Sequence, residues 1–132
     1  LKAVTQWLHT QILQYPKLVV LGDFNIAPDE RDVHDPALWC GKIFCSEPER
    51  NALKAMETVG LSDTFRLFAQ ADKSFSWWDY RAGNFRRNHG LRIDLILASK
   101  PLVDICQACY IDREPRTWDK PSDHAPVVTE FQ

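Results

Sequence analysis

The sequence lacks a basic excess and a long apolar run. Its 132 residues contain 16 Lys and Arg against 18 Asp and Glu, which gives a formal net charge of −2. Total charge therefore gives no sign of nucleic-acid binding, although it leaves room for a local basic patch. No apolar run approaches the roughly 20 residues that a membrane-spanning helix requires. We therefore expect no membrane association.

Cysteine is also scarce, and it is not arranged as a disulfide scaffold. The four cysteines are Cys40, Cys45, Cys106 and Cys109. The last two form a CxxC in a strand-like stretch, where residues three apart point to opposite faces. A zinc site needs four converging ligands, so we expect free thiols rather than zinc. Free thiols are typical of a reducing cytosol, and we predict a cytoplasmic protein.

The amino-terminal stretch LKAVTQWLHTQILQ carries polar residues throughout, so it is not a signal peptide. The chain begins with Leu1 rather than Met, which predicts that it is a piece of a longer protein. Its length, with 45% hydrophobic and 26% charged residues, predicts one soluble globular domain.

Periodicity and capping signals predict two helices. Apolar residues at helical spacing indicate an amphipathic helix over residues 2–14. A second helix begins at Ser46, because Glu49 three residues on completes a capping box, and Gly60 supplies its end. The stretch 26–45 between them has no period and is predicted to be a long loop.

The rest of the chain is strand-like. Apolar, aromatic and β-branched runs predict strands at residues 17–22, 75–80, 91–98, 104–111 and 126–131, with a short turn of helix near 63–69. We therefore expect an α/β layered domain with a mixed β-sheet covered by helices on one face.

Polar residues directly follow the first predicted strand. In the stretch LGDFN, Asp23 and Asn25 stand at the carboxyl end of an apolar run. Ligands in α/β sheets favour such strand ends. Gly, Asp and Asn also favour turns, so a binding site and a plain turn remain equal alternatives here.

An acid interrupts the most apolar predicted strand. In LRIDLILAS, leucine and isoleucine occupy one face, which leaves Asp94 on the other face with Arg92. A carboxylate in such a strand is costly unless it is paired. Its partner is either Arg92 or a histidine that the carboxylate orients, and we favour the histidine.

The stretch SDHAP places Asp123 and His124 at the start of the last predicted strand. A lone Asp–His pair is often exposed on the surface without a functional role. If this strand end adjoins Asp23, Asn25 and Asp94, however, acids, an amide and an imidazole converge. Such a set suits metal-assisted hydrolysis of a phosphodiester, with carboxylates holding Mg²⁺ and a base orienting water. Neither a G-x-S-x-G elbow nor a Walker-type phosphate loop is present.

A segment between two predicted strands is rich in arginine. Residues 80–93 contain no acid and four arginines: Arg81, Arg86, Arg87 and Arg92. The accompanying aromatic residues are Trp77, Trp78, Tyr80 and Phe85. Arginines that meet phosphates, beside aromatics that stack on bases, predict a DNA contact. The alternative is a solvated loop beside an aromatic core, in which Trp78 is expected in either case.

Four stretches, GDFN, FSWWDYR, GLRIDLILAS and PSDHAP, occur in an order that resembles the exodeoxyribonuclease III family of abasic-site endonucleases. This family belongs to the endonuclease/exonuclease/phosphatase (DNase I-like) superfamily. GDFN and SDHAP are shared across the superfamily, whereas FSWWDYR leading into GLRIDLILAS is typical of the DNA-repair branch. The resemblance matches only the C-terminal half of the family domain. It implies that residues 1–132 form half of a four-layer α/β sandwich.

The resemblance also implies roles for the candidate residues. Asp23 would align or deprotonate the attacking water, and Asn25 would bond to the phosphate oxygens. Asp94 would hydrogen-bond His124, and either Asp23 or this pair would act as the base. Asp123 would assist a site for Mg²⁺, with Mn²⁺ as an alternative. The ligands of this site would include Asp23, Asn25, Asp123 and His124.

The implied activity belongs to DNA base-excision repair. It is a 3′→5′ exodeoxyribonuclease that also cuts double-stranded DNA at abasic sites. Trp77 would pack against the base-free sugar, and Arg81, Arg86 and Arg87 would contact DNA. The family's metal-binding Glu lies in an N-terminal QE motif that this sequence lacks. We therefore expect weak metal binding and little hydrolysis from this chain alone, with the missing N-terminal half as its partner.

Two alternatives remain open. One is another superfamily phosphodiesterase or phosphatase that acts on phospholipid or inositol phosphate. The other is a non-catalytic, DNA-binding remnant.

Overall fold

The computed structural model describes residues 2–39 and 41–132; the expected free thiol of Cys40 and the first residue, Leu1, lie outside the described residues. The helices are α1 (Lys2–Gln14), α2 (Pro36–Trp39), α3 (Glu47–Thr58), α4 (Asn84–Arg87) and α5 (Lys100–Val103). The strands are β1 (Val19–Asp23), β2 (Leu61–Asp63), β3 (Asp94–Ser99), β4 (Cys106–Ile111) and β5 (Val127–Phe131). Short 3₁₀ helices are η1 (Glu30–Asp32), η2 (Thr64–Leu67), η3 (Arg81–Gly83) and η4 (Glu114–Thr117). Among the described residues, no helix has the length and apolar character needed to span a membrane.

Helices α1 and α3 form where the sequence predicts them. The capping box at α3 is present: the Glu49 backbone N–H donates to Ser46 Oγ at 3.3 Å, and the Ser46 N–H donates to the Glu49 carboxylate at 3.2 Å. Gly60 follows the helix with a φ of +117°, which favours glycine because a side chain would be strained there. These local signals fix the start and the end of α3.

The strands pair antiparallel in two small sheets. The first has the order β1-β3-β2, and the second consists of β4 and β5. The α/β class is confirmed, but within the described residues the strands form two small antiparallel sheets rather than one mixed sheet. The register of the first sheet places Asp23 opposite Asp94, so the sheet itself brings two of the candidate acids together.

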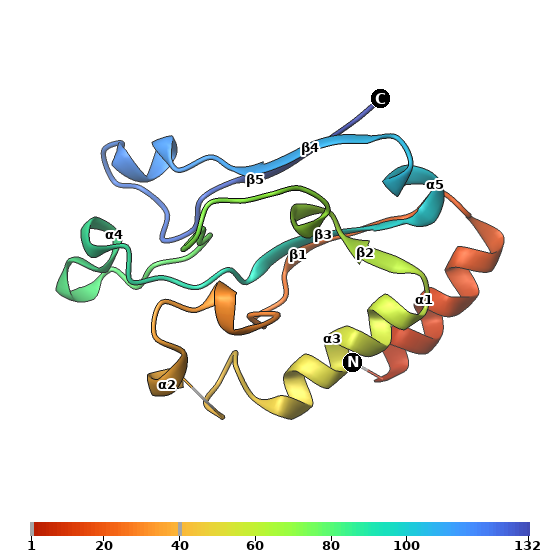
Figure 1. The fold of residues 1–132 in the computed structure, drawn as a ribbon, viewed down its shortest axis with the longest axis horizontal. Coiled ribbons are helices and arrows are strands. Elements are labelled where there is room, and N and C mark those ends of the chain that lie inside the picture. The colour runs from red at the N-terminus through yellow and green to blue at the C-terminus, as the bar shows by residue number, and fades with distance from the viewer. Residues whose placement is uncertain (1, 40) are drawn as a thin grey trace.

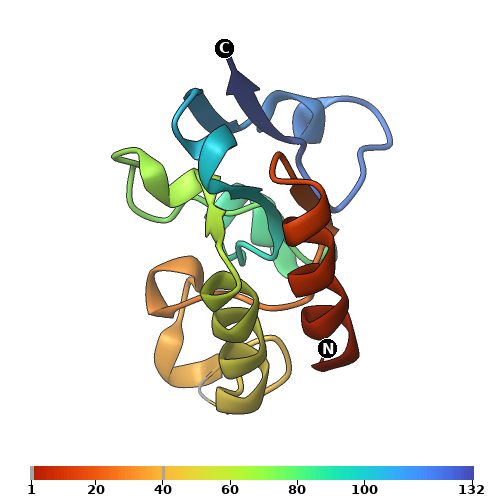
Figure 2. The same cartoon turned by 90° about the vertical axis from the view of Figure 1, so that its right-hand side faces the viewer.

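The helices α1 and α3 lie side by side on one face of the first sheet, while β4 and β5 lie on its other side (Figures 1 and 2). Leu8 of α1, Leu53 and Met56 of α3, and Leu95 and Leu97 of β3 form the core between helices and sheet. On the opposite face, the Thr64 hydroxyl donates to the Ile96 carbonyl at 2.8 Å and lies 2.8 Å from the Thr129 hydroxyl of β5. The predicted cover of helices on one face is therefore confirmed.

Two predicted segments differ from the structure. Residues 75–80 are not a strand, because this stretch makes only isolated bridges, from Trp77 to Leu91 and His124. Its aromatic composition reflects burial of Phe75 and Trp78 in a core cluster rather than a ladder of strand pairs. The long loop predicted at 26–45 contains η1 and α2, which are too short to produce a helical period.

Candidate active site

Two strand ends and one loop build the candidate site. Asp23 is the last residue of β1, and Asp94 is the first residue of β3 directly opposite. His124 lies in the loop before β5 and bridges to Trp77. One ligand atom from each of Asp23, Asp94 and His124 lies within 4.8 Å of the others. The sequence-predicted convergence of these three residues is present.

The imidazole of His124 has a defined orientation. Its Nδ1 lies 2.8 Å from Asp94 Oδ2, a distance at which an Nδ1–H donates to the carboxylate. Its Nε2 faces outward, 3.8 Å from Asp23 Oδ2 and 3.8 Å from Asp123 Oδ1. The half-buried Asp94 carboxylate therefore selects the tautomer and leaves Nε2 for chemistry. The alternative in which Arg92 pairs with Asp94 is wrong, because Arg92 binds Asp32 and Asp63 instead.

Asp94 is held from behind by Ser76, a fully buried residue that the sequence analysis did not single out. The Ser76 hydroxyl oxygen accepts the backbone N–H groups of Ile93 and Asp94, each at 3.1 Å. Burial raises the pKa of the Asp94 carboxyl above its usual value, against the opposing effect of hydrogen bonds from His124 and Ser76. The charge of Asp94 is therefore placed in a costly environment, which is common at functional sites.

Asp123 and Trp77 form a second layer around the imidazole. Trp77 Nε1 donates to Asp123 Oδ2 at 3.0 Å, which leaves Oδ1 on the side of His124. The Trp77 ring also meets Phe44 edge-on, with the ring centroids 5.9 Å apart. Trp77 is thus fixed at the edge of the site, and Phe44 contacts one side of the Trp77 ring.

For the stretch LGDFN, the two alternatives were a binding site and a plain turn, and Asn25 has features of both. It has a φ of 53°, and its backbone N–H donates to Asp23 Oδ1 at 2.9 Å. This is a local Asx-type turn, yet it also orients the Asp23 carboxylate toward the cluster. The Asn25 residue itself is exposed beside the cluster.

The arginine–aromatic segment, residues 77–93, is part core and part surface. Trp78 is fully buried, as expected, and packs edge-on against Phe85 with centroids 5.0 Å apart. Arg86 and Arg87 are exposed on α4. Arg81 is exposed too, but it forms an ion pair with Asp79 at 2.8 Å. Asp79, an acid within the segment, therefore offsets one of its charges.

Arg92 has a structural role that sequence reasoning missed. Only 1% of it is exposed, and it pairs with Asp32 at 2.6 Å and Asp63 at 2.7 Å. Arg66 joins the network through Asp32. The partners of Arg92 are 60 and 29 residues away in sequence, so no local motif could have revealed them.

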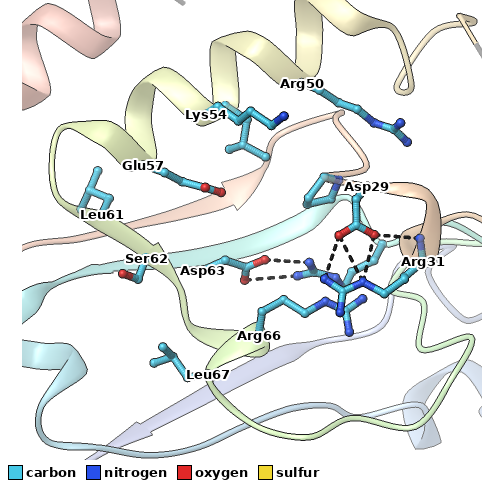
Figure 3. A pocket seen from close by; sticks show the side chains of 13 residues that line it. Asp29, Arg31, Arg50, Lys54, Glu57, Leu61, Ser62, Asp63, Arg66 and Leu67 are labelled. Carbon is cyan, nitrogen blue, oxygen red and sulfur yellow. Dashed lines mark hydrogen bonds and ion pairs between the residues drawn. The ribbon is translucent and has the colours of Figure 1, made fainter.

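This network forms one wall of a cavity of about 600 Å³ between α3 and the sheet (Figure 3). Arg31, at the rim, is paired with Asp29. Some of the charged residues that line the cavity are therefore already held in ion pairs: Asp29, Arg31, Asp63, Arg66 and Arg92. None of Asp23, Asp94 and His124 lines it, so it lies apart from the candidate site.

The donor set at the site fits part of a hard-cation site. Asp23 and Asp123 offer carboxylate oxygens on the side of Nε2, while Asp94 Oδ2 is engaged by Nδ1. Magnesium is commonly held by one or two carboxylates and retains several waters. The residues present therefore suit an incomplete protein ligand set.

Comparison with known proteins agrees with this geometry. The sequence matches the endonuclease/exonuclease/phosphatase family over residues 2–124. It is 37% identical to exodeoxyribonuclease III of Haemophilus influenzae, over 96% of this chain and 50% of that protein. The structure of the 3′ phosphatase NExo from Neisseria, bound to a product DNA hairpin, superposes with a TM-score of 0.96 at 40% identity, over 99% of this chain and 51% of that chain. An AP endonuclease from Archaeoglobus fulgidus superposes with a TM-score of 0.84 at 34% identity, over 98% of this chain and 54% of that chain. The chain spans about half the length of the curated relatives it matches.

Proposed function

The chain belongs to the endonuclease/exonuclease/phosphatase family, and we propose that it is the C-terminal portion of a divalent-metal-dependent DNA phosphodiesterase of base-excision repair. The proposed reactions are removal of nucleotides from 3′ ends and cleavage beside abasic sites. One observation carries the proposal: Asp94 orients His124 at 2.8 Å, and the free Nε2 faces the carboxylates of Asp23 and Asp123.

The proposed mechanism assigns separate tasks to the two faces of the imidazole. Asp94 holds Nδ1–H, so that Nε2 is aimed at a phosphate oxygen of the substrate. Asp23, whose carboxylate is oriented by the Asn25 backbone N–H, aligns the attacking water and accepts its proton. Fixed orientation of this kind lowers the barrier because the groups need not reorganise during reaction.

The proposed metal ligands are Asp23, Asn25, Asp123 and His124. A bound Mg²⁺ or Mn²⁺ would stabilise negative charge on the phosphoryl oxygens. Asp23 and Asp123 would hold the ion by carboxylate oxygens and Asn25 by its amide oxygen, with Trp77 keeping Asp123 in place. His124 Nε2 would complete the set only while no phosphate oxygen occupies it. Because this is an incomplete set, we propose that the chain alone binds metal weakly and hydrolyses little.

The proposed DNA contact uses the exposed arginines of the arginine–aromatic segment. Arg86 and Arg87 lie on α4, free of the acid that engages Arg81. Phosphate contacts by such residues give affinity without sequence preference. We propose that Trp77, which is held between Asp123 and Phe44, meets the sugar next to the scissile phosphate.

The test combines this chain with the N-terminal half of a related enzyme and follows cleavage of a duplex oligonucleotide that carries one abasic site. We expect cleavage with Mg²⁺, none with EDTA, and a loss of at least about 100-fold in His124→Ala, in the range that a group stabilising the transition-state charge contributes. His9→Ala, an exposed histidine of α1, is the matched control and should retain full activity. Cleavage that survives in His124→Ala would overturn the proposal.

The same assay separates the alternatives. A substrate panel with inositol phosphates and phospholipids tests for a different superfamily hydrolase, which would cleave them in preference to DNA. A chain that binds DNA with strong salt dependence but never cleaves it, even in the complemented state, would be a non-catalytic remnant.

A further inference from the structure

Arg116 is a buried cation that has no acidic partner among the described residues. It lies in η4, on the connection from β4 to β5, and only 7% of it is exposed. Its Nε has no hydrogen-bond partner, and within residues 2–39 and 41–132 it forms no ion pair. Arg92, the other deeply buried arginine, has two carboxylates. Because an unpaired buried charge is costly, another interaction has to hold Arg116 in place.

Three aromatic rings provide that interaction. The guanidinium carbon of Arg116 lies 4.5 Å from the ring centroid of Phe85 and 5.7 Å from those of Trp78 and Tyr80. A cation over an aromatic face is attracted by the negative face of the ring, and this attraction is strongest where water is excluded. All three rings belong to the arginine–aromatic segment, so Arg116 binds the segment that carries Arg86 and Arg87.

Two of these residues, Tyr80 through its side chain and Trp78 through its backbone, also contact the loop that contains His124. The Tyr80 hydroxyl donates to the Pro121 carbonyl at 2.8 Å. The backbone N–H of Trp78 donates to the Asp123 carbonyl at 3.0 Å. Arg116 therefore lies against the residues through which the arginine–aromatic segment and the residue 121–125 loop are joined. The connection from β4 to β5 that carries Arg116 extends to the end of the molecule where α4 lies (Figure 1).

We propose that Arg116 is a positioning residue whose cation fixes the arginine–aromatic segment relative to Asp123 and His124. The expected effect on DNA affinity rests on the proposed function, whereas the contacts of Arg116 with the three rings do not depend on it. Three facts carry it: the absence of an acid on Arg116 in the described chain, the three rings around its guanidinium, and the two hydrogen bonds from those rings' residues to the catalytic loop.

The test compares Arg116→Lys, which keeps a cation, with Arg116→Met, which keeps an apolar side chain of similar length without charge. Hydrogen exchange of the Trp78 amide is measured without DNA, and affinity for a DNA hairpin is measured by fluorescence anisotropy. We expect the Lys variant to remain within about threefold of the parent chain in both measurements. We expect the Met variant to exchange about tenfold faster at Trp78 and to bind DNA about tenfold more weakly. Arg31→Met, which removes an exposed charge distant from this segment in sequence, is the matched control and should change the Trp78 exchange rate by less than twofold.

The two readouts separate the two proposals. If the parent chain does not bind DNA, the proposed function fails, while the exchange rates still decide the role of Arg116. If Met equals or exceeds Lys in Trp78 protection, the side chain only fills space and the inference is overturned. A Met variant with a lower melting temperature but unchanged Trp78 exchange in the folded state would overturn it as well.

Discussion

At the scale of single residues, the candidate site depends on the Asp94 carboxylate, which lies in a strand that is otherwise mostly apolar. An acid in an apolar strand costs free energy unless it is paired, so the sequence alone predicted a histidine partner for Asp94. The structure supplies that partner at 2.8 Å. What the sequence could not give is Ser76, since a buried serine within an aromatic stretch has no distinguishing pattern. Its role depends on β3 being folded against it.

Asp94→Asn is expected to stabilise the fold while it removes activity. Burial raises the pKa of Asp94, so its charged form costs folding free energy at neutral pH, and this cost disappears as acid protonates the group. Asparagine keeps an oxygen that accepts from His124. We expect a melting temperature about 2–4 °C higher than the parent's at pH 7 in EDTA, with a difference that shrinks toward zero below about pH 4. An unchanged or lower melting temperature at pH 7, measured by calorimetry, would contradict this.

Asp79→Asn is expected to strengthen DNA binding. The hydrogen bonds from Arg81 lower the pKa of Asp79 to about 2, so the acid stays charged, and engages Arg81, until the pH falls through that value. Removing the acid frees Arg81 for phosphate and should raise affinity about two- to fivefold. Asp72→Asn removes an equal charge from an exposed site outside the segment and serves as the control in the same anisotropy titration. Equal gains in both variants would mean that only net charge matters.

At the scale of elements, the helices were predictable because their signals are local. A 3.6-residue period and a capping box need no tertiary partner, so α1 and α3 were predicted with nearly the right bounds. Strand composition is less specific. Residues 75–80 have it, but they lie in a segment whose Trp77 bridges to two different partners. The strand β2 has three residues and α4 has four, too few for any period to show.

Ser46→Ala tests the local origin of α3. Ser46 Oγ accepts the Glu49 N–H, and the Glu49 carboxylate accepts the Ser46 N–H. Losing the hydroxyl should lower the free energy of unfolding by about 1 kcal/mol, measured by urea denaturation. Ser62→Ala, outside any helix, should cost less than half as much. A loss below that of the control would show that packing, not capping, fixes where α3 starts.

At the scale of the whole molecule, one buried arginine joins three distant segments. Arg92 pairs with Asp32 of η1 and Asp63 of β2. Arg92→Met would leave Asp63 without a cation and the buried Asp32 with Arg66 alone, and it should destabilise the fold by about 3–5 kcal/mol. Arg31→Met breaks an exposed pair and should cost less than about 1 kcal/mol. Equal losses in urea denaturation would show that the network does not join these segments energetically.

Also at the scale of the whole molecule, the apolar side chain of Leu21 is exposed close to the candidate catalytic residue Asp23. Leu21 lies two residues before Asp23 on β1 and is 67% exposed. A strand at a sheet edge with an exposed leucine is a surface that another element covers in most proteins. The chain spans about half of its relatives, and we propose that the other half covers this strand.

Leu21→Glu should then leave the melting temperature of the isolated chain within about 2 °C of the parent. It should reduce cleavage in the complemented assay by at least tenfold, because a charge placed in a buried contact is costly. Lys17→Glu reverses the charge at an exposed position just before β1, so that a carboxylate stands there as well, and it should leave complementation intact. If Leu21→Glu complements as well as Lys17→Glu does, β1 stays open to solvent in the assembled enzyme, and the second half docks elsewhere.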